Sequence, residues 1–162
     1  MDDILYVYLH NVLAGQLIRS KVQLSFQYDE SYLDYDKAQP ISAALPLQIQ
    51  VFANEVVKPF FSGLLPEGLV RLKLAHLFQV SPDNIFELLR EMGADCAGAI
   101  TVLPPDQELA CLKENSYRFL SDHKAAQILS TLNTRPLYAG SGDFCVSGAG
   151  VQRQIACLPY RQ

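Results

Sequence analysis

The feature that most constrains the fold is a strictly alternating segment at residues 22–28, VQLSFQY. Val22, Leu24, Phe26 and Tyr28 fall on one side of an extended chain, and the residues between them are polar. A period of two residues is typical of an antiparallel strand that is buried on one face. The segment therefore predicts a sheet with one face against a core.

Two earlier segments indicate partners for this strand. Ile4–Leu9 and Leu13–Ile18 are rich in apolar residues, and His10-Asn11 between them suits a turn. Two more strands are predicted at Leu45–Val51 and Val56–Val57. The first 60 residues are therefore expected to be mostly sheet.

Helical patterns begin after residue 60. Pro66 suits the first turn of a helix, because the N–H that proline lacks is not needed there. A broad apolar face is expected on it, with the polar side chains pointing elsewhere. The apolar residues are Leu69, Val70, Leu72, Leu74, Leu77 and Phe78, and the polar ones are Arg71, Lys73 and His76.

A second helix is predicted after Ser81, with Ser81 as its cap and Pro82 at its first position. Gly93 is expected to end it. Its apolar positions follow the spacing of an amphipathic helix: Ile85, Leu88, Leu89 and Met92. A strand at 99–103 and a helix at 121–130 complete the pattern. Strands, then helices, then a strand favour an α+β fold, an antiparallel sheet or partly open barrel with helices packed on one side.

Composition excludes several function classes. A formal net charge of −4 and the lack of a basic cluster argue against direct nucleic-acid binding. No leader peptide is visible, and no apolar run reaches the roughly 18 residues of a membrane span. The four cysteines are scattered without a C-x-x-C pair, so we expect no metal site and a reducing cytoplasm.

Residues 139–150 form a glycine-rich stretch, but enzyme motifs are absent from it. The Walker pattern requires a lysine that is missing, and Asp143-Phe144 is followed by Cys145 rather than glycine. Asp34 and Asp36 lie in a tyrosine-rich polar stretch, where solvated carboxylates are the rule. We therefore expect no enzyme activity of the chain by itself and no cofactor.

Residues 60–68, FFSGLLPEG, are the most informative segment for function. Large apolar side chains lie beside a turn and a helix start. They could fill the core, or at least one aromatic could project outward as an interface anchor. The candidate partner-binding residues are Phe60, Phe61, Leu64, Leu65, Pro66 and Glu67.

Residues 4–104 resemble the N-terminal domain of HipA-like serine/threonine kinases, the toxins of bacterial toxin–antitoxin modules. Six segments carry the resemblance, in the order that the family has them. They are residues 7–15 (VYLHNVLAG), 26–29 (FQYD), 40–47 (PISAALPL), 60–67 (FFSGLLPE), 81–89 (SPDNIFELL) and 93–99 (GADCAGA).

The end of the chain resembles the S-x-A-G-x-Q loop that opens the HipA kinase core. Its residues here are Ser147, Gly148, Ala149, Gly150 and Gln152. The resemblance implies that Ser147 is a phosphoacceptor in a remnant nucleotide loop. The family usually has a lysine where this chain has Gln154.

The resemblance implies two domains: 1–104, similar to the HipA N-terminal domain, and 105–162, similar to the truncated start of the kinase N-lobe. Some modules of the family have a separate small protein of this type, HipS, which neutralises a HipT-type kinase. By resemblance this chain is such a cytoplasmic antitoxin, with a HipA-like kinase as partner. A HipB-type DNA-binding repressor could join through that kinase. The alternative is the N-terminal fragment of a split or truncated HipA-like kinase.

Overall fold

The computed structural model describes residues 3–96, 99–107, 109 and 121–131, and the following account concerns these residues. An open, four-stranded antiparallel sheet has the strand order β3-β2-β1-β4. The elements in chain order are β1 (Asp3–Leu9), β2 (Val12–Ser20), β3 (Gln23–Tyr28), α1 (Glu30–Leu33), α2 (Asn54–Gly63), α3 (Gly68–Leu77), α4 (Ile85–Met92), the 3-10 helix η1 (Gly93–Asp95), β4 (Ile100–Leu103) and α5 (Asp122–Thr131). The predicted α+β class with an antiparallel sheet is confirmed.

The sheet is built on the β1–β2 hairpin. His10 and Asn11 both have positive φ, as the predicted turn requires, and the hairpin register pairs Leu5 with Leu17. Gly15 lies where β2 passes between β1 and β3, and a Cβ atom there would stand 2.2 Å from the carbonyl oxygen of Gln27. Glycine is needed at this position because the neighbouring strand leaves no room for a side chain.

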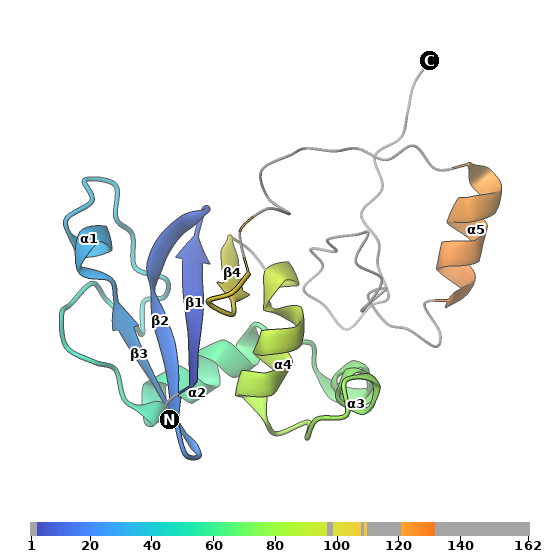
Figure 1. Cartoon of the computed structure of the whole chain (residues 1–162), viewed down its shortest axis with the longest axis horizontal. Helices are drawn as coiled ribbons and strands as arrows, with labels where there is room; N and C mark the ends of the chain where they lie inside the picture. The colour runs from blue at the N-terminus through green and yellow to red at the C-terminus, as the bar shows by residue number, and fades with distance from the viewer. Residues whose placement is uncertain (1–2, 97–98, 108, 110–120, 132–162) are drawn as a thin grey trace.

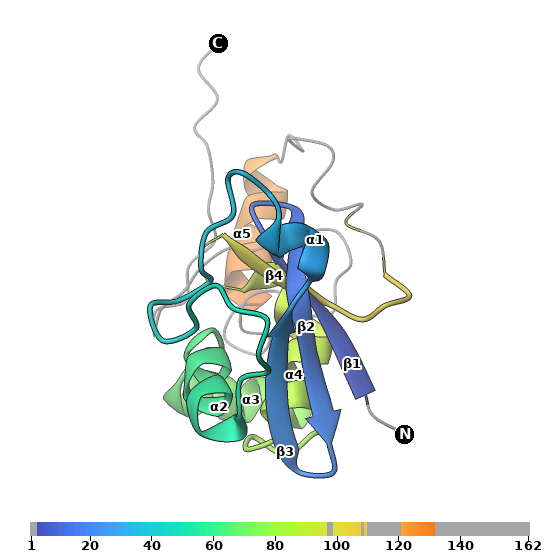
Figure 2. The ribbon, with the colours of Figure 1, turned by 90° about the vertical axis from the view of Figure 1, so that its left-hand side faces the viewer.

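One face of the sheet carries the core. Leu5, Leu17 and Phe26 are fully buried there, and Phe61 of α2 and Leu89 of α4 are fully buried with them. Figures 1 and 2 show α2 and α4 on this side of the sheet. The predicted alternation in β3 is confirmed for its buried residues, whereas Val22 lies in the preceding turn and is 91% exposed.

Two predicted strands are wrong. Leu45–Val51 is a loop, with the isolated bridges Ser42–Leu45 and Phe26–Phe52 at its two ends, and its apolar residues Ile49 and Val51 are exposed. Pro46 lacks the N–H that a ladder would need. Val56–Val57 lies in α2, where Val57 and Phe61 share the buried face. Burial at helical spacing therefore overrides the strand preference of β-branched valine.

The tyrosine hydroxyl of Tyr28 fixes the course of the loop before α2. It donates a hydrogen bond to the carbonyl oxygen of Leu45 at 2.5 Å and accepts one from the N–H of Ile41 at 2.9 Å. Burial raises the pKa of this tyrosine, while the hydrogen bond from Ile41 acts in the opposite direction. The loop at 41–45 is thus held by a side chain of the sheet.

The second predicted helix begins at Ile85, three residues after the predicted first position at Pro82. Asn84 caps α4 by accepting a hydrogen bond from the N–H of Glu87 at 3.3 Å. Ser81 instead accepts one from the N–H of Asp83, within the turn before the helix. Gly93 is the C-terminal cap, as expected, but its φ of −66° leads directly into η1. The predicted strand at 99–103 and the predicted helix at 121–130 are confirmed as β4 and α5.

Candidate functional site

The α2–α3 segment, residues 60–68, runs from the last turn of α2 to the first residue of α3. Leu64 is the C-terminal cap of α2, and its N–H donates to the carbonyl oxygens of Phe61 and Ser62. Glu67 has extended backbone and precedes α3. Gly68 has a φ of +57°, a conformation that glycine adopts without a steric penalty. The segment therefore has a defined course from one helix to the next.

Arg71 of α3 reaches back to hold this segment. Its Nε donates to the carbonyl oxygen of Pro66 at 2.8 Å, and one terminal nitrogen donates to the carbonyl oxygen of Ser62 at 2.7 Å. The other terminal nitrogen contacts Ser62 Oγ at 3.1 Å. The Ser62 carbonyl oxygen at the end of α2 also accepts a hydrogen bond from the N–H of Leu65 at 3.2 Å, so Arg71 adds a further donor there. One guanidinium therefore joins the end of α2, the turn and α3.

The six candidate residues divide into core and surface. Phe61 is fully buried and Leu65 is 4% exposed, so both belong to the core. The ring of Phe61 lies 5.9 Å from that of Phe26 and 5.1 Å from that of Phe60. Phe60, Leu64 and Pro66 are half-buried, and Glu67 is exposed. Contact with a partner is therefore open to Phe60, Leu64, Pro66 and Glu67, whereas Phe61 holds the segment from below.

The outer side of α3 continues this surface. Leu69 is 76% exposed and Leu72 is 53% exposed, whereas only Leu74 and Ala75 of the helix are buried. The predicted apolar face of α3 is confirmed for Leu74, which is buried, and for Val70 and Phe78, which pack half-buried against the core. It is wrong for Leu69, Leu72 and Leu77, which are exposed, and Arg71 was wrongly predicted to point away. Arg71 points inward onto the carbonyl oxygens of Pro66 and Ser62, and Leu69 and Leu72 lie on the outer side of the helix.

A shallow groove of about 320 Å³ runs beside the same segment. It is lined by Asn54, Glu55, Lys58, Pro59, Ser62 and Ile85. Ser62 is shared with the Arg71 contacts, so the groove and the α2–α3 segment form one continuous surface region. The carboxylate and the ammonium on α2 give it both signs of charge.

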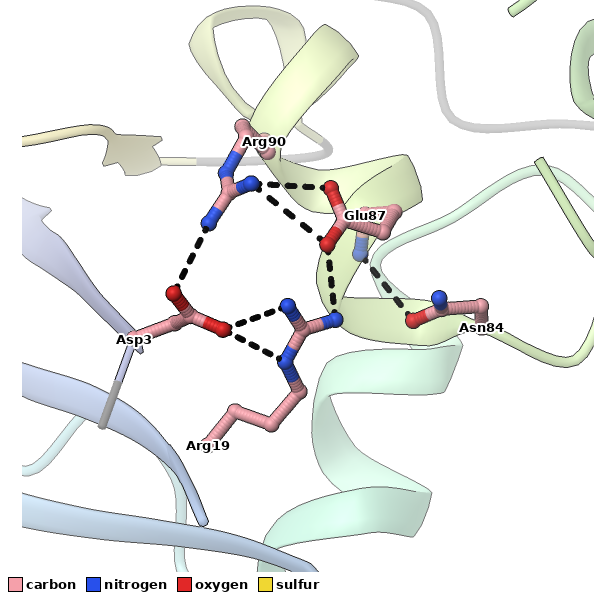
Figure 3. Close-up of polar contacts among 5 residues, drawn as sticks. All are labelled: Asp3, Arg19, Asn84, Glu87 and Arg90. Atoms are coloured by element: carbon pink, nitrogen blue, oxygen red, sulfur yellow. Dashed lines mark hydrogen bonds and ion pairs between the residues drawn. The ribbon is translucent and has the colours of Figure 1, made fainter. Parts of the chain in front are cut away.

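A charged cluster fixes α4 to the sheet, and sequence reasoning did not find it (Figure 3). Arg19 of β2 contacts Asp3 at 2.5 Å and Glu87 at 2.7 Å, and Arg90 contacts Glu87 at 3.1 Å. The Arg19 guanidinium also lies 4.5 Å from the centre of the Phe86 ring. The hydrogen bond from Arg19 lowers the pKa of Asp3. The cluster is a structural contact between the two halves of the domain.

The remaining predicted site residues lie outside this surface. Ser147, Gly148, Ala149, Gly150 and Gln152 are outside the described residues. The three histidines, at positions 10, 76 and 123, are exposed, and Asp34 and Asp36 are exposed too. Within the described part of the chain, no group of three or more His, Cys, Asp and Glu could hold a metal ion. None of the helices described there is long and apolar enough to cross a membrane.

The described fold and surface define a small α+β domain with an open antiparallel sheet, helices on one face and an exposed apolar helix side. The chain belongs to the HipA N-terminal domain family, whose family model matches residues 5–103. A solved complex of Shewanella oneidensis HipA, HipB and its operator DNA has this fold, with a TM-score of 0.64 and 24% identity. The structural match covers 80% of this chain and 29% of the solved chain.

Sequence relatives come in two lengths. The provisionally named kinase Y4mE of Sinorhizobium fredii is 37% identical over 156 residues, which is 94% of this chain and 37% of that protein. The serine/threonine-protein kinase toxin HipA of Shewanella oneidensis is 31% identical, over 72% of this chain and 26% of the toxin. The chain thus spans about a third of the length of these relatives. An uncharacterized protein of Haemophilus influenzae is 25% identical over 96 residues, which is 59% of this chain but 87% of that protein.

Proposed function

We propose that this chain is an antitoxin, a regulatory protein that binds a HipA-like serine/threonine kinase and holds it inactive. The observation that carries the proposal is the α2–α3 segment, which Arg71 fixes at the surface of a HipA N-terminal domain. A segment held in one conformation before binding loses less conformational entropy when it binds. The domain acts through this surface and not through catalysis.

The short Haemophilus influenzae relative supports a free-standing role. Since 96 aligned residues make up 87% of that protein, the domain occurs there with little additional chain. A domain of this size offers enough surface for an interface of standard size, roughly 800 Å² on each partner. Such a domain could therefore bind the kinase as a separate protein.

The second candidate function is an N-terminal region of a split or truncated HipA-like kinase, active only with the remaining catalytic part. The match to Y4mE favours it, because that alignment extends over 94% of this chain and well past residue 103. The neighbouring coding sequence distinguishes the two functions. A frame that starts inside the kinase core favours the fragment, and one with its own complete glycine loop favours the antitoxin.

The testing experiment is a pull-down of the full chain against the kinase-like product encoded beside it, with kinase activity measured in the same samples. Stable binding with loss of kinase activity is the expected result. Binding that restores activity would replace the antitoxin with a split enzyme. A chain that does not bind at all would contradict both functions.

Glu67 tests whether the α2–α3 segment is the contact. Its side chain is exposed, so Glu67→Lys should leave the fold intact while placing the opposite charge in the interface. Binding should weaken by about 10-fold. Asp83→Lys is the matched control, because Asp83 is also exposed and lies in the turn before α4. Equal affinities for the two variants would remove Glu67 from the interface.

Ser147 is proposed as a phosphoacceptor in this system, on the resemblance of residues 147–152 to the kinase glycine loop. Mass spectrometry of the chain after incubation with the neighbouring kinase and ATP tests it. Phosphate on Ser147 that is lost in Ser147→Ala supports the proposal. Phosphate found only at other positions contradicts it.

A further inference from the structure

Helix α3 is apolar on two opposite sides. Leu74 and Ala75 are buried beneath it, and Val70 is half-buried and packs against the core. On the other side Leu69 and Leu72, three residues apart and therefore neighbours on the helix surface, are 76% and 53% exposed. Single exposed leucines are ordinary, but a helix with apolar residues on both sides is typical of one covered on both sides.

We propose that the outer face of α3, formed by Leu69 and Leu72, is a docking surface for the catalytic region of a HipA-like kinase. This inference rests on the proposed function and extends its contact beyond the α2–α3 segment. Leu69 follows Gly68 directly, so the leucines continue the surface that the segment begins. Arg71, between the two leucines in sequence, holds the segment and the helix together through Pro66 and Ser62. Segment and helix face therefore present a single preorganised surface.

The relatives indicate why the kinase is the occupant. In Y4mE this chain matches 37% of the length, so most of that kinase-named protein lies outside the match and shares a chain with the domain. A domain joined to a larger partner in one chain needs an interdomain surface, and such surfaces resemble protein–protein interfaces. The outer face of α3 exposes two leucines that could form such a surface.

The charges on α3 define the kind of surface that fits. The helix contains no Asp or Glu, and Arg71 is turned inward onto the segment. Lys73 and His76 are exposed beside the leucines. The expected counterpart on the kinase is an apolar patch with carboxylates at the edge that faces Lys73 and a basic side chain at the edge that faces Glu67, because opposite charges at the rim of an interface speed and orient association.

The test compares two double variants that make the same chemical change on different surfaces. Leu69→Glu with Leu72→Glu alters the proposed face. Ile49→Glu with Val51→Glu is the matched control, because these residues are 67% and 53% exposed and lie in the loop before α2. That loop and α3 lie at opposite ends of the domain in Figure 1. All substituted side chains are exposed, so both variants should melt close to the wild-type temperature.

Binding of the full-length chains to the neighbouring kinase is measured by calorimetry. The face variant should lose about 30-fold or more in affinity, as expected when two apolar anchors are replaced by charge, and the loop variant should bind like wild type. Wild-type-like binding by the face variant overturns the inference and leaves the antitoxin function standing. Equal losses in both variants also overturn it, because the effect is then general charge repulsion. Absence of binding by the wild-type chain rejects the proposed function together with the inference.

Sedimentation of the wild-type chain alone examines a second copy as the occupant. A monomer is the expected result. A dimer that the Leu69→Glu, Leu72→Glu variant converts to monomer would assign the face to self-association and overturn the kinase as its partner.

Discussion

Helices α3 and α4 follow one another in the chain and are both rich in leucine, but they use their apolar residues in opposite ways. In α4, five of eight residues are buried, and the charged residues Glu87 and Arg90 join the cluster with Asp3 and Arg19. In α3, two of ten residues are buried and the most exposed leucines face solvent. One helix holds the domain together, and the other offers a surface.

The difference teaches that apolar content alone does not separate a core helix from a helix with an exposed apolar side. The arginines make the distinction. Arg19 and Arg90 connect α4 to the sheet, whereas Arg71 connects α3 only to the segment beside it. In α3 the inward side holds Arg71 together with the buried Leu74 and Ala75, and the outer side carries the exposed Leu69 and Leu72.

The largest expected effect comes from the same substitution made in each helix. Leu89→Ala removes a fully buried side chain of α4 and should lower the free energy of unfolding by about 2–5 kcal/mol, because it leaves a cavity in the core. Leu72→Ala in α3 should change it by no more than about 0.5 kcal/mol. Urea unfolding of both variants measures the difference. Similar losses would mean that α3 contributes to the core as much as α4 does.

Arg71 gives the next effect, which is expected in binding more than in stability. Arg71→Ala removes the guanidinium donor from the carbonyl oxygens of Pro66 and Ser62, of which Ser62 keeps the N–H of Leu65 at 3.2 Å, and unfolding should become easier by about 1–2 kcal/mol. Kinase affinity should fall by about 10-fold at temperatures well below melting, because the segment must then be ordered during binding. Arg71→Lys should recover little of this affinity, since an ammonium cannot reproduce the planar fork of the guanidinium.

Arg90→Ala is the control for Arg71 on the other helix. Arg90 contacts Glu87 and Asp3 at the surface, so its loss should leave kinase affinity unchanged. A drop in affinity in both variants, in proportion to their loss of stability, would show that Arg71 acts only on the fold.

The sequence predicted most of the sheet because its signal is local. Alternation in β3 and the turn at His10-Asn11 depend on neighbouring residues, and the family resemblance rests on motifs of the same local kind. The helix at Val57 was missed because its evidence is burial of Val57 with Phe61 against β3, a contact between distant parts of the chain. Local patterns therefore predicted helices and strands better than they predicted contacts between distant parts of the chain.

The candidate site shows the same limit more sharply. The sequence placed the site in residues 60–68, yet it could not separate Phe61, which is buried, from Glu67, which is exposed. Arg71 had been expected to point away from the apolar face, because nothing in a helical pattern marks an arginine that binds carbonyls five and nine residues earlier. The inward direction of Arg71 and the outward direction of Leu69 and Leu72 could therefore not be read from the helical pattern.

The smallest expected effect is a change in the pH dependence of stability when Asp3, in the cluster that holds α4, is replaced. The hydrogen bond from Arg19 lowers the pKa of Asp3 below its ordinary value of 3.8, so the folded state favours the carboxylate. The stabilisation that this provides is fully present above the unfolded pKa and is lost as the pH falls through the lower, folded pKa. Asp3→Asn should therefore melt slightly below wild type at neutral pH, and the gap should close in acid below 3.8. Melting temperatures of both proteins across this range measure it. Asp3 belongs to the cluster that holds α4 and not α3, so kinase affinity at neutral pH should be the same for both proteins. A difference in melting temperature that stays constant in acid would mean that the effect does not come from the charge of Asp3.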